Sequence, residues 1–199
     1  QIIKEKSGIT LQNIIGKTPS YAALIINDNL NQAFQTICDI YGFNKLEKMM
    51  LLSLKDTISK ASFSITAKTA LIIATTKGNV NVLNSKLSYI AKERVYLSEL
   101  GKQIKNFFGF INEPIIVSNA CVSGVLEVAV AKRLIQNEFY DNAFIVGGDL
   151  ISEFTLSGFK SFQAISDQPC KPFSKYRNGI TLGEAAASLA ITSNNNSDE

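Results

Sequence analysis

Cys121 stands where a strand is predicted to turn into a helix, a position that suits a nucleophile. The β-branched run Ile115-Ile116-Val117 before it is typical of a buried strand. After it, an apolar helix is predicted to begin at about Ser123. The unpaired N–H groups at the start of a helix favour negative charge, so we expect Cys121 to favour its nucleophilic thiolate form. A sharp strand-to-helix turn also exposes the side chain, and Gly124 lets a substrate or another backbone segment come close.

A structural role is the alternative for Cys121, because most free cysteines act as small buried hydrophobic residues. The helix that follows is apolar on most of its circumference, interrupted only by Glu127, Lys132, Arg133 and Gln136. Such a helix is expected to be buried on most of its circumference. Position alone therefore leaves Cys121 a candidate, and the rest of the sequence must decide between the two roles.

Strands and helices are predicted to alternate along the chain on both sides of this turn. Residues 7–18 are expected to form a loop. The predicted strands are 69–76, 115–117, 142–146 (ended by Gly147-Gly148) and 185–192, and the predicted helices are 29–41, 45–60, 85–94, 97–108 and the helix from 123. This order favours an α/β layered domain with a largely parallel sheet flanked by helices.

Composition excludes several classes of function. The chain has 199 residues and a net charge of +3, without the dense basic stripe of a nucleic-acid-binding protein. No apolar run reaches the roughly 18 residues of a membrane span. Three cysteines, Cys38, Cys121 and Cys170, have no metal-binding spacing, so we expect reduced thiols, no metal and a cytoplasmic location. The sequence contains no histidine, so a Cys–His pair cannot form within this chain alone.

Four segments together resemble a known family. Val117-Ser118-Asn119-Ala120-Cys121-Val122-Ser123-Gly124 resembles the active-site cysteine motif of β-ketoacyl synthases, the condensing enzymes of fatty-acid and polyketide synthesis. Three further segments resemble family segments in the same order: residues 74–79 (ATTKGN), residues 143–149 (AFIVGGD), and residues 170–174 (CKPFS) with 179–186 (GITLGEAA).

The resemblance implies a thiolase-like fold, in which two similar halves stack as five layers, α-β-α-β-α. Residues 1–199 would form the N-terminal half. We expect the family's first strand to lie outside this sequence, together with the C-terminal half that carries the family's two histidines. Family members usually dimerise through the sheet edge near the cysteine, which implies a homodimer or a heterodimer with a related synthase subunit.

The resemblance also assigns chemistry to Cys121. The cysteine would accept an acyl group as a thioester, and its backbone N–H would be one donor of the oxyanion hole. The substrate would be a phosphopantetheine thioester of an acyl carrier protein, and no other cofactor is implied. A malonyl thioester would then lose carbon dioxide and attack the acyl group. Since the polarising histidines are absent here, we expect this chain alone to be acylated slowly at most and not to condense.

Four other residues are weaker candidates. Phe159 and Phe173 could line an acyl channel, although core packing is the simpler explanation for the phenylalanines near Phe159. Lys45 and Lys48 open a predicted helix, and basic residues near this helix meet the acyl carrier protein in the family. A solvated helix face is the alternative for these two lysines.

Three functions remain open from the sequence. The first is the nucleophile half of a β-ketoacyl synthase. The second is a non-condensing partner subunit, like a chain length factor, although such subunits typically replace the active-site cysteine. The third is a module that binds an acyl carrier protein without catalysis.

Overall fold

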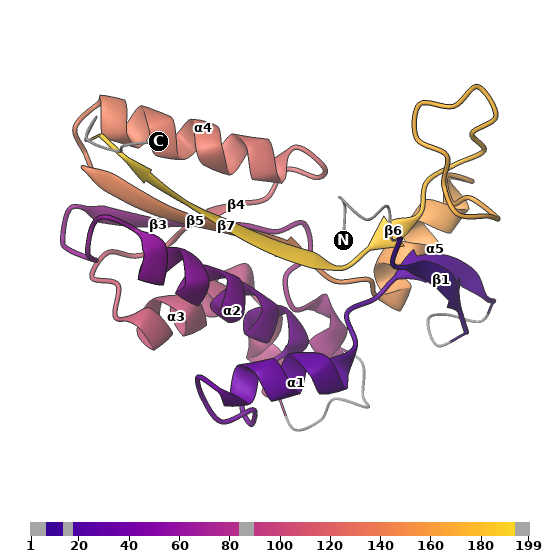
Figure 1. Ribbon diagram of the computed structural model, residues 1–199, viewed down its shortest axis with the longest axis horizontal. Helices are drawn as coiled ribbons and strands as arrows, with labels where there is room; N and C mark the ends of the chain where they lie inside the picture. Colours follow the sequence, from indigo (N-terminus) through magenta and orange to yellow (C-terminus); the bar gives the residue numbers. More distant parts are fainter. Residues whose placement is uncertain (1–6, 14–17, 84–89, 194–199) are drawn as a thin grey trace. The chain divides into compact units, whose positions relative to one another are not determined.

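The computed structural model describes residues 7–13, 18–83 and 90–193 (Figure 1). The chain forms two compact units. The first unit comprises Gln1–Ile26 and Leu150–Ala185, and the second unit comprises Asn27–Asp149 and Ala186–Glu199. Cys121 belongs to the second unit.

A four-stranded sheet is the centre of the second unit. Its strands lie in the order β4 (Ile115–Val117), β3 (Thr69–Ala74), β5 (Asn142–Asp149) and β7 (Ala185–Thr192). Both β4 and β5 run parallel to β3. The backbone N–H of Ser193 donates to Asp141 O at 3.0 Å, which places the end of β7 beside the start of β5. The predicted, largely parallel sheet is therefore confirmed, and the carboxyl ends of β3, β4 and β5 share one edge.

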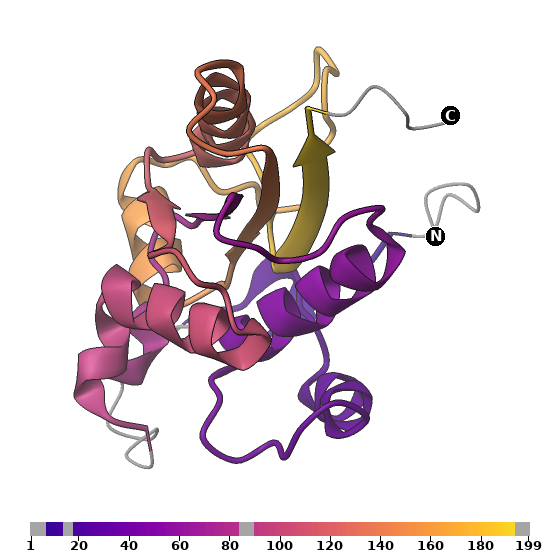
Figure 2. The same ribbon diagram turned by 90° about the vertical axis from the view of Figure 1, so that its left-hand side faces the viewer.

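Helices cover both faces of this sheet (Figures 1 and 2). Helix α4 (Ser123–Gln136) packs on one face against β3, β4 and β5. Helices α2 (Lys45–Lys60) and α3 (Leu97–Phe108) lie on the other face, with α1 (Asn27–Gln35) beside α2. Because both faces are covered, every residue of β3 is buried, which explains its continuous apolar run.

Two groups of side chains form the core on either side of the sheet. The α4 side holds Ala70, Ile72, Ala131, Ala143 and Ile145. On the opposite side the fully buried ring of Phe144 lies 4.8 Å from the ring of Phe63 and 6.0 Å from that of Phe110, between centroids. Successive residues of β3 and β5 thus point to opposite faces of the sheet, as the two-residue period of a strand requires.

The first unit contains a smaller sheet and one helix. Strand β1 (Ile9–Gln12) is antiparallel to β2 (Ser20–Ala23), and β6 (Leu182–Gly183) is parallel to β2. Helix α5 (Glu153–Ser161) begins after Ser152, whose side chain accepts the N–H of Thr155. The predicted loop at residues 7–18 is wrong over β1, because this strand is too short and too exposed to show an alternating pattern.

Most predicted elements are confirmed, and several to the residue. The bounds of α2, α3, β4 and β7 match the prediction. Helix α1 was predicted too late and too long, and β5 continues through the two glycines that were expected to end it. Of the predicted helix 85–94, residues 85–89 lie outside the described residues, and Lys92–Val95 forms a 3-10 helix, η4.

Helix α4 is buried on one face within this chain, and its expected burial against the C-terminal half stays a prediction. Its buried residues are Ser123, Glu127 and Ala131, which face the sheet. Val125 is 71% exposed and Val128 is 37% exposed. Only one face of α4 packs against this chain, and two polar residues occupy that face.

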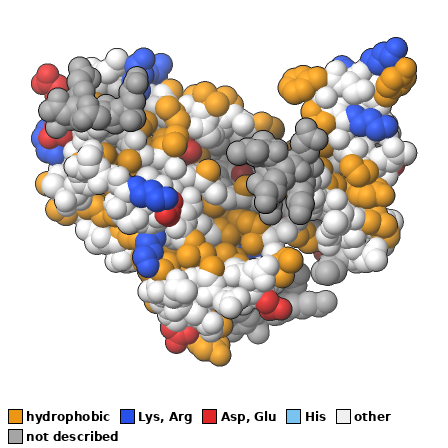
Figure 3. Space-filling view, viewed as in Figure 1, with side chains coloured by type: hydrophobic (Ala, Val, Ile, Leu, Met, Phe, Trp, Pro, Cys, Tyr) orange, Lys and Arg blue, Asp and Glu red, His pale blue; other side chains and the backbone are white. Residues whose placement is uncertain are grey.

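None of the helices in the described ranges has the length and apolar character that a bilayer crossing needs. On the face shown in Figure 3, Lys and Arg side chains are scattered among uncharged ones and form no continuous stripe.

Candidate active site around Cys121

Cys121 is exposed in a tight turn between β4 and α4. The N–H of Val122 donates to Asn119 O at 3.2 Å, and the N–H of Ser123 donates to Ala120 O at 3.3 Å. Ala120, directly before the cysteine, has a φ of 46°, a left-handed conformation that is uncommon for a residue with a Cβ. The strand-to-helix turn predicted from the sequence is confirmed, and it presents the thiol at the surface of the described chain.

The hydroxyl of Ser123 holds this turn in its strained form. Its Oγ accepts the N–H of Asn119 at 2.8 Å and donates to Ala120 O at 2.8 Å. Ser123 itself is 4% exposed. A small buried hydroxyl therefore satisfies two backbone groups of the turn that carries Cys121.

Replacing Ser123 with alanine is expected to destabilise the fold by about 1–2 kcal/mol, because the N–H of Asn119 loses its acceptor and Ala120 O keeps only the N–H of residue 123. The free energy of unfolding in urea would measure this effect. Ser157→Ala is the matched control, because Ser157 is exposed on α5 and its Oγ donates only to helix carbonyls. The control is expected to change stability by less than about 0.5 kcal/mol. Equal effects at the two positions would contradict the role given to Ser123.

Asp149, the last residue of β5, holds the loop that follows β3. Its Oδ1 accepts Thr75 Oγ1, the N–H of Thr76 and Thr76 Oγ1, each at 2.9 Å, and the N–H of Lys77 at 3.4 Å. The N–H of Thr76 also lies 3.2 Å from Oδ2. One carboxylate thus fixes the direction in which the chain leaves the central strand.

The loop after β3 is also joined to the segment that leads to Cys121. The N–H of Thr75 donates to Val117 O at 3.2 Å, and Ser118 Oγ donates to Thr76 O at 3.4 Å. The carboxyl ends of β3, β4 and β5 therefore form one hydrogen-bonded edge beside the cysteine turn. In open α/β sheets this edge is where ligands bind.

Glu127 is a buried carboxyl on the sheet-facing side of α4. It is 7% exposed, and its Oε2 has no hydrogen-bond partner among the described residues. A Cβ added at Gly147 of β5 would lie 2.9 Å from Glu127 Oε1 and 3.7 Å from the Cβ of Ala74. Glycine at position 147 therefore leaves the space that the carboxyl fills.

Burial raises the pKa of Glu127 to about 7, and a hydrogen bond with the backbone of Ala74 opposes part of this rise. Desolvation is the larger cause because it disfavours the charged form. The carboxyl has an ordinary pKa of 4.5. The folded state therefore binds more protons than the unfolded state between about pH 4.5 and 7, and stability falls as pH rises through this window.

Replacing Glu127 with glutamine is expected to remove this pH dependence. Relative to the unsubstituted chain, the variant should gain about 1–3 kcal/mol of stability between about pH 4 and pH 8. Urea unfolding at both pH values would measure the gain. Glu138→Gln, at an exposed position just after α4, is the control and is expected to show no such gain. A pH dependence that is the same in all three chains would contradict the assignment.

A second buried carboxyl, Glu47 of α2, lies in a network of polar side chains. Glu47 is 0% exposed and accepts the N–H of Asn44 at 2.7 Å and Asn79 Nδ2 at 2.8 Å. The guanidinium of Arg94 donates to both of its oxygens, with the Nε–Oε1 distance at 3.0 Å. This network joins α2 to η4 and to the chain after β3, and we assign it a structural role.

The structure places the other predicted residues as follows. Lys45 and Lys48 are both half-buried, and Lys48 Nζ donates to Asn31 Oδ1 at 2.8 Å. Burial lowers the pKa of Lys48, and the charge of Glu47 raises it by less. Phe159 is half-buried on α5, and Phe173 is fully exposed. Docking by the lysines and acyl-chain binding by the phenylalanines both stay predictions.

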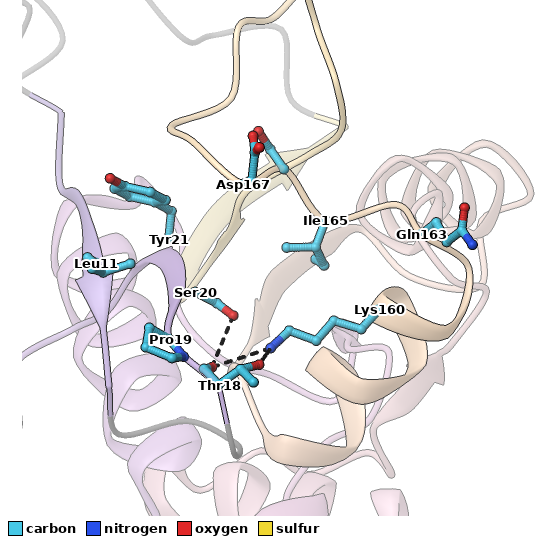
Figure 4. Close-up of a pocket in the computed structure, with 10 residues that line it drawn as sticks. Leu11, Thr18, Pro19, Ser20, Tyr21, Lys160, Gln163, Ile165 and Asp167 are labelled. Atoms are coloured by element: carbon cyan, nitrogen blue, oxygen red, sulfur yellow. Dashed lines mark hydrogen bonds between the residues drawn. The ribbon is translucent and has the colours of Figure 1, made fainter.

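A cavity of about 280 Å³ lies in the first unit (Figure 4). Lys160 points across it to Thr18, with Nζ 2.6 Å from Thr18 Oγ1, and Ser20, Tyr21 and Asp167 also line it. The lining does not include Cys121, Phe159 or Phe173. The amine of Lys160 is already hydrogen-bonded within the cavity wall.

Sequence reasoning missed Ser123, Glu127 and Asp149 as parts of the site. Ser123 lies two residues after the cysteine at the predicted start of the helix, where a serine hydroxyl often bonds to nearby backbone groups. In the sequence Glu127 interrupts an apolar helix, and its spacing of four from Ser123 places both residues on one face. Asp149 comes after the predicted strand 142–146, where acidic residues are also common in ordinary turns.

Comparisons with known proteins identify the family and the fold. The family model of the β-ketoacyl synthase N-terminal domain matches residues 53–196. A chain in the complex of the ketosynthase ApeO with its chain length factor ApeC from Xenorhabdus doucetiae superposes with a TM-score of 0.73 and 19% identity, over 96% of this chain and 52% of that one. A β-ketoacyl synthase from Burkholderia phymatum STM815 superposes with a TM-score of 0.66 and 15% identity, over 86% and 47%.

The ishigamide ketosynthase/chain length factor superposes with a TM-score of 0.63 and 13% identity, over 90% of this chain and 51% of that one. No curated protein matches the sequence. The chain spans about half the length of the first two matched chains, 52% and 47%. The structural likenesses support the thiolase-like α/β fold, and the family match rests on residues 53–196. The chain therefore belongs to the β-ketoacyl synthase family, to whose N-terminal domain residues 53–196 correspond.

Proposed function

We propose that this chain is the nucleophile half of a 3-oxoacyl-(acyl carrier protein) synthase of fatty-acid or polyketide and polyene synthesis, with Cys121 as its nucleophile. The observation that carries the proposal is the exposed thiol of Cys121 in the strained turn between β4 and α4. Membership of the family supports the class of reaction, and the geometry of the turn supports Cys121 as the nucleophile. Cys38 and Cys170 have no comparable turn geometry at the end of a parallel strand.

The reaction proceeds in two steps. The sulfur of Cys121 attacks the carbonyl carbon of an acyl thioester, and the phosphopantetheine thiol of the acyl carrier protein leaves. A malonyl thioester then loses carbon dioxide, and the carbanion attacks the acyl carbon while the sulfur of Cys121 leaves. The product is a 3-oxoacyl thioester, and the acyl carrier protein thioesters are the only cofactor-bearing reactants.

Negative charge develops on the acyl carbonyl oxygen in both steps. The backbone N–H of Cys121 is the proposed donor from this chain. The sequence has no histidine, so we assign the groups that polarise the malonyl thioester to residues outside these 199. Alone, the chain is expected to be acylated slowly at most and not to condense.

A related synthase subunit or a second copy of the chain is the proposed partner. Two similar structures come from ketosynthases described together with a chain length factor, which favours the heterodimer. Strand β4 lies at an edge of the sheet and leads directly into the cysteine turn, so it is the proposed contact. The free cysteines favour the reducing cytoplasm as the location.

The alternative is a non-condensing partner subunit or a module that only binds an acyl carrier protein. Intact-mass spectrometry after incubation with an acyl-(acyl carrier protein) thioester distinguishes the proposed nucleophile half from these alternative functions. A mass gain equal to the acyl group, removed by hydroxylamine, is expected. Complex formation with the carrier protein and no mass gain would instead identify the binding module or the non-condensing subunit.

A further inference from the structure

The first two turns of α4 place two buried polar residues in line on the face toward the sheet. Ser123 and Glu127 are four residues apart, so one lies above the other along the helix. Ser123 ties the Cys121 turn together, and Glu127 is the next residue along this face. Whatever moves this face of α4 away from the strands therefore also moves the hydroxyl that holds the turn.

The Glu127 carboxyl fills a space that the neighbouring strands leave for it. Gly147 of β5 provides this space, since a Cβ there would approach Oε1 to 2.9 Å. Ala74, the last residue of β3, forms the other side of the space. These two strand ends continue into the Thr75–Lys77 loop and Asp149, which are hydrogen-bonded to each other beside the cysteine turn. Glu127 thus packs directly behind the edge at which Cys121 lies.

Few charged groups surround Glu127. Strands β3 and β4 carry no charged residue, and β5 carries only Asp149, whose Oδ1 is occupied by Thr75, Thr76 and Lys77. On α4 itself Lys132 and Arg133 are exposed. The raised pKa of Glu127 comes from desolvation and not from a charged neighbour. An ionised Glu127 would therefore have to admit water or leave its space.

We propose that Glu127 is a positioning residue that holds the Cys121 turn in place while its carboxyl is protonated and loosens the turn when it ionises. The part of this inference that concerns acyl transfer rests on the proposed function of Cys121. Loss of the proton separates the start of α4 from the ends of β3 and β5. The hydrogen bonds that Ser123 makes to Asn119 and Ala120 weaken as a result, and acyl transfer slows.

Amide hydrogen exchange of the peptide that contains Cys121 tests the inference without requiring activity. The quantity to follow is the ratio of the exchange rate in the unsubstituted chain to that in Glu127→Gln. This ratio is expected to rise by about threefold to tenfold between pH 6 and pH 8, because the turn loses about one hydrogen bond. Dividing the two rates at each pH removes the intrinsic pH dependence of exchange. The same ratio for the exposed control Glu138→Gln is expected to stay constant. A constant ratio for Glu127→Gln would overturn the inference.

A second pair of variants keeps the test decisive if Glu127→Gln does not fold. Gly147→Ala places a Cβ against the carboxyl, so it is expected to raise exchange in the turn at every pH. Adding Glu127→Ala removes the clash and is expected to restore slow exchange. The inference would be overturned if the turn exchanged in Gly147→Ala as slowly as in the unsubstituted chain. It would also be overturned if the double variant exchanged as fast as Gly147→Ala.

Acyl transfer measured on the same variants separates this inference from the proposed function. The ratio of the acylation rate in the unsubstituted chain to that in Glu127→Gln is expected to fall by about threefold to tenfold between pH 6 and pH 8. If the chain is acylated but the exchange ratio stays constant, Cys121 remains the proposed nucleophile and only the role of Glu127 is overturned. Absence of acylation in every chain would overturn the proposed function, and the exchange ratio would still decide the role of Glu127.

Discussion

Replacing Arg94 with alanine is expected to lower the free energy of unfolding by about 3–5 kcal/mol, the cost of removing one partner from a buried ion pair. The Glu47 side chain is fully buried, and that of Arg94 is 15% exposed. The substitution leaves the carboxylate with neutral donors only, from Asn44 and Asn79. Chemical denaturation followed by circular dichroism would measure the loss.

Two companion variants make this prediction specific. Lys60→Ala breaks an ion pair with Asp56 whose side chains are 73% and 65% exposed, and its expected cost is at most about 0.5 kcal/mol. Glu47→Gln combined with Arg94→Met removes both charges and is expected to recover much of the stability lost in Arg94→Ala. A cost for Arg94→Ala no larger than that for Lys60→Ala would contradict the buried network.

Replacing Asp149 with alanine is expected to destabilise the fold by about 2–4 kcal/mol, because the N–H and hydroxyl of Thr76 lose a charged acceptor. Thr75 Oγ1 loses the same acceptor but keeps the N–H of Gly78 as a donor, at 3.0 Å. The loop after β3 also contacts Val117 and Ser118, so acylation of Cys121 is expected to slow as well. Urea unfolding and intact-mass kinetics would measure the two effects.

Asp149→Asn retains an acceptor oxygen and is expected to keep more stability than Asp149→Ala. Asp56→Ala is the control for removing an acidic side chain at the surface, with an expected change of at most about 0.5 kcal/mol. If Asp149→Ala slowed acylation with no loss of stability, the loop would not depend on this carboxylate for its structure. If it changed neither property, the hydrogen-bonded edge would have no role.

Hydrophobic periodicity was sufficient to predict the elements of the second unit that have one clear apolar face. Helix α2 is the clearest example: its apolar spacing predicted both bounds, and its start is fixed by Asn44 and Glu47, each of which accepts a backbone N–H there. Strands β4 and β7 were predicted from β-branched and small residues. Strand β1 was missed because its four residues are exposed or half-buried in an order that does not alternate.

The cysteine could be predicted from the sequence, and the residues that support it could not. Cys121 belongs to a local strand–turn–helix pattern, which a single sequence records. Glu127 and Asp149 act through contacts with residues that are distant in sequence, such as Gly147 for the first and Thr75 for the second. A charged residue in an apolar helix is most often exposed, so only the three-dimensional packing distinguishes Glu127 from a surface residue.

The exposed valines of α4 show another limit of the sequence. An apolar helix predicts burial, but it does not identify the segment that covers each face. In this chain the sheet covers the face that carries Ser123 and Glu127, and Val125 stays exposed. The apolar composition of the helix predicts that it is buried, but it does not distinguish the face that contacts the sheet from the face that carries Val125.

Site-resolved acylation tests the central claim most directly. The chain would be reacted with an acyl-(acyl carrier protein) thioester and digested, and the acyl group would be quantified on the peptides that contain Cys38, Cys121 and Cys170. The account predicts that the acyl group is found on Cys121 and that Cys121→Ala abolishes the modification. An acyl group on Cys38 or Cys170, or modification that persists in Cys121→Ala, would contradict it.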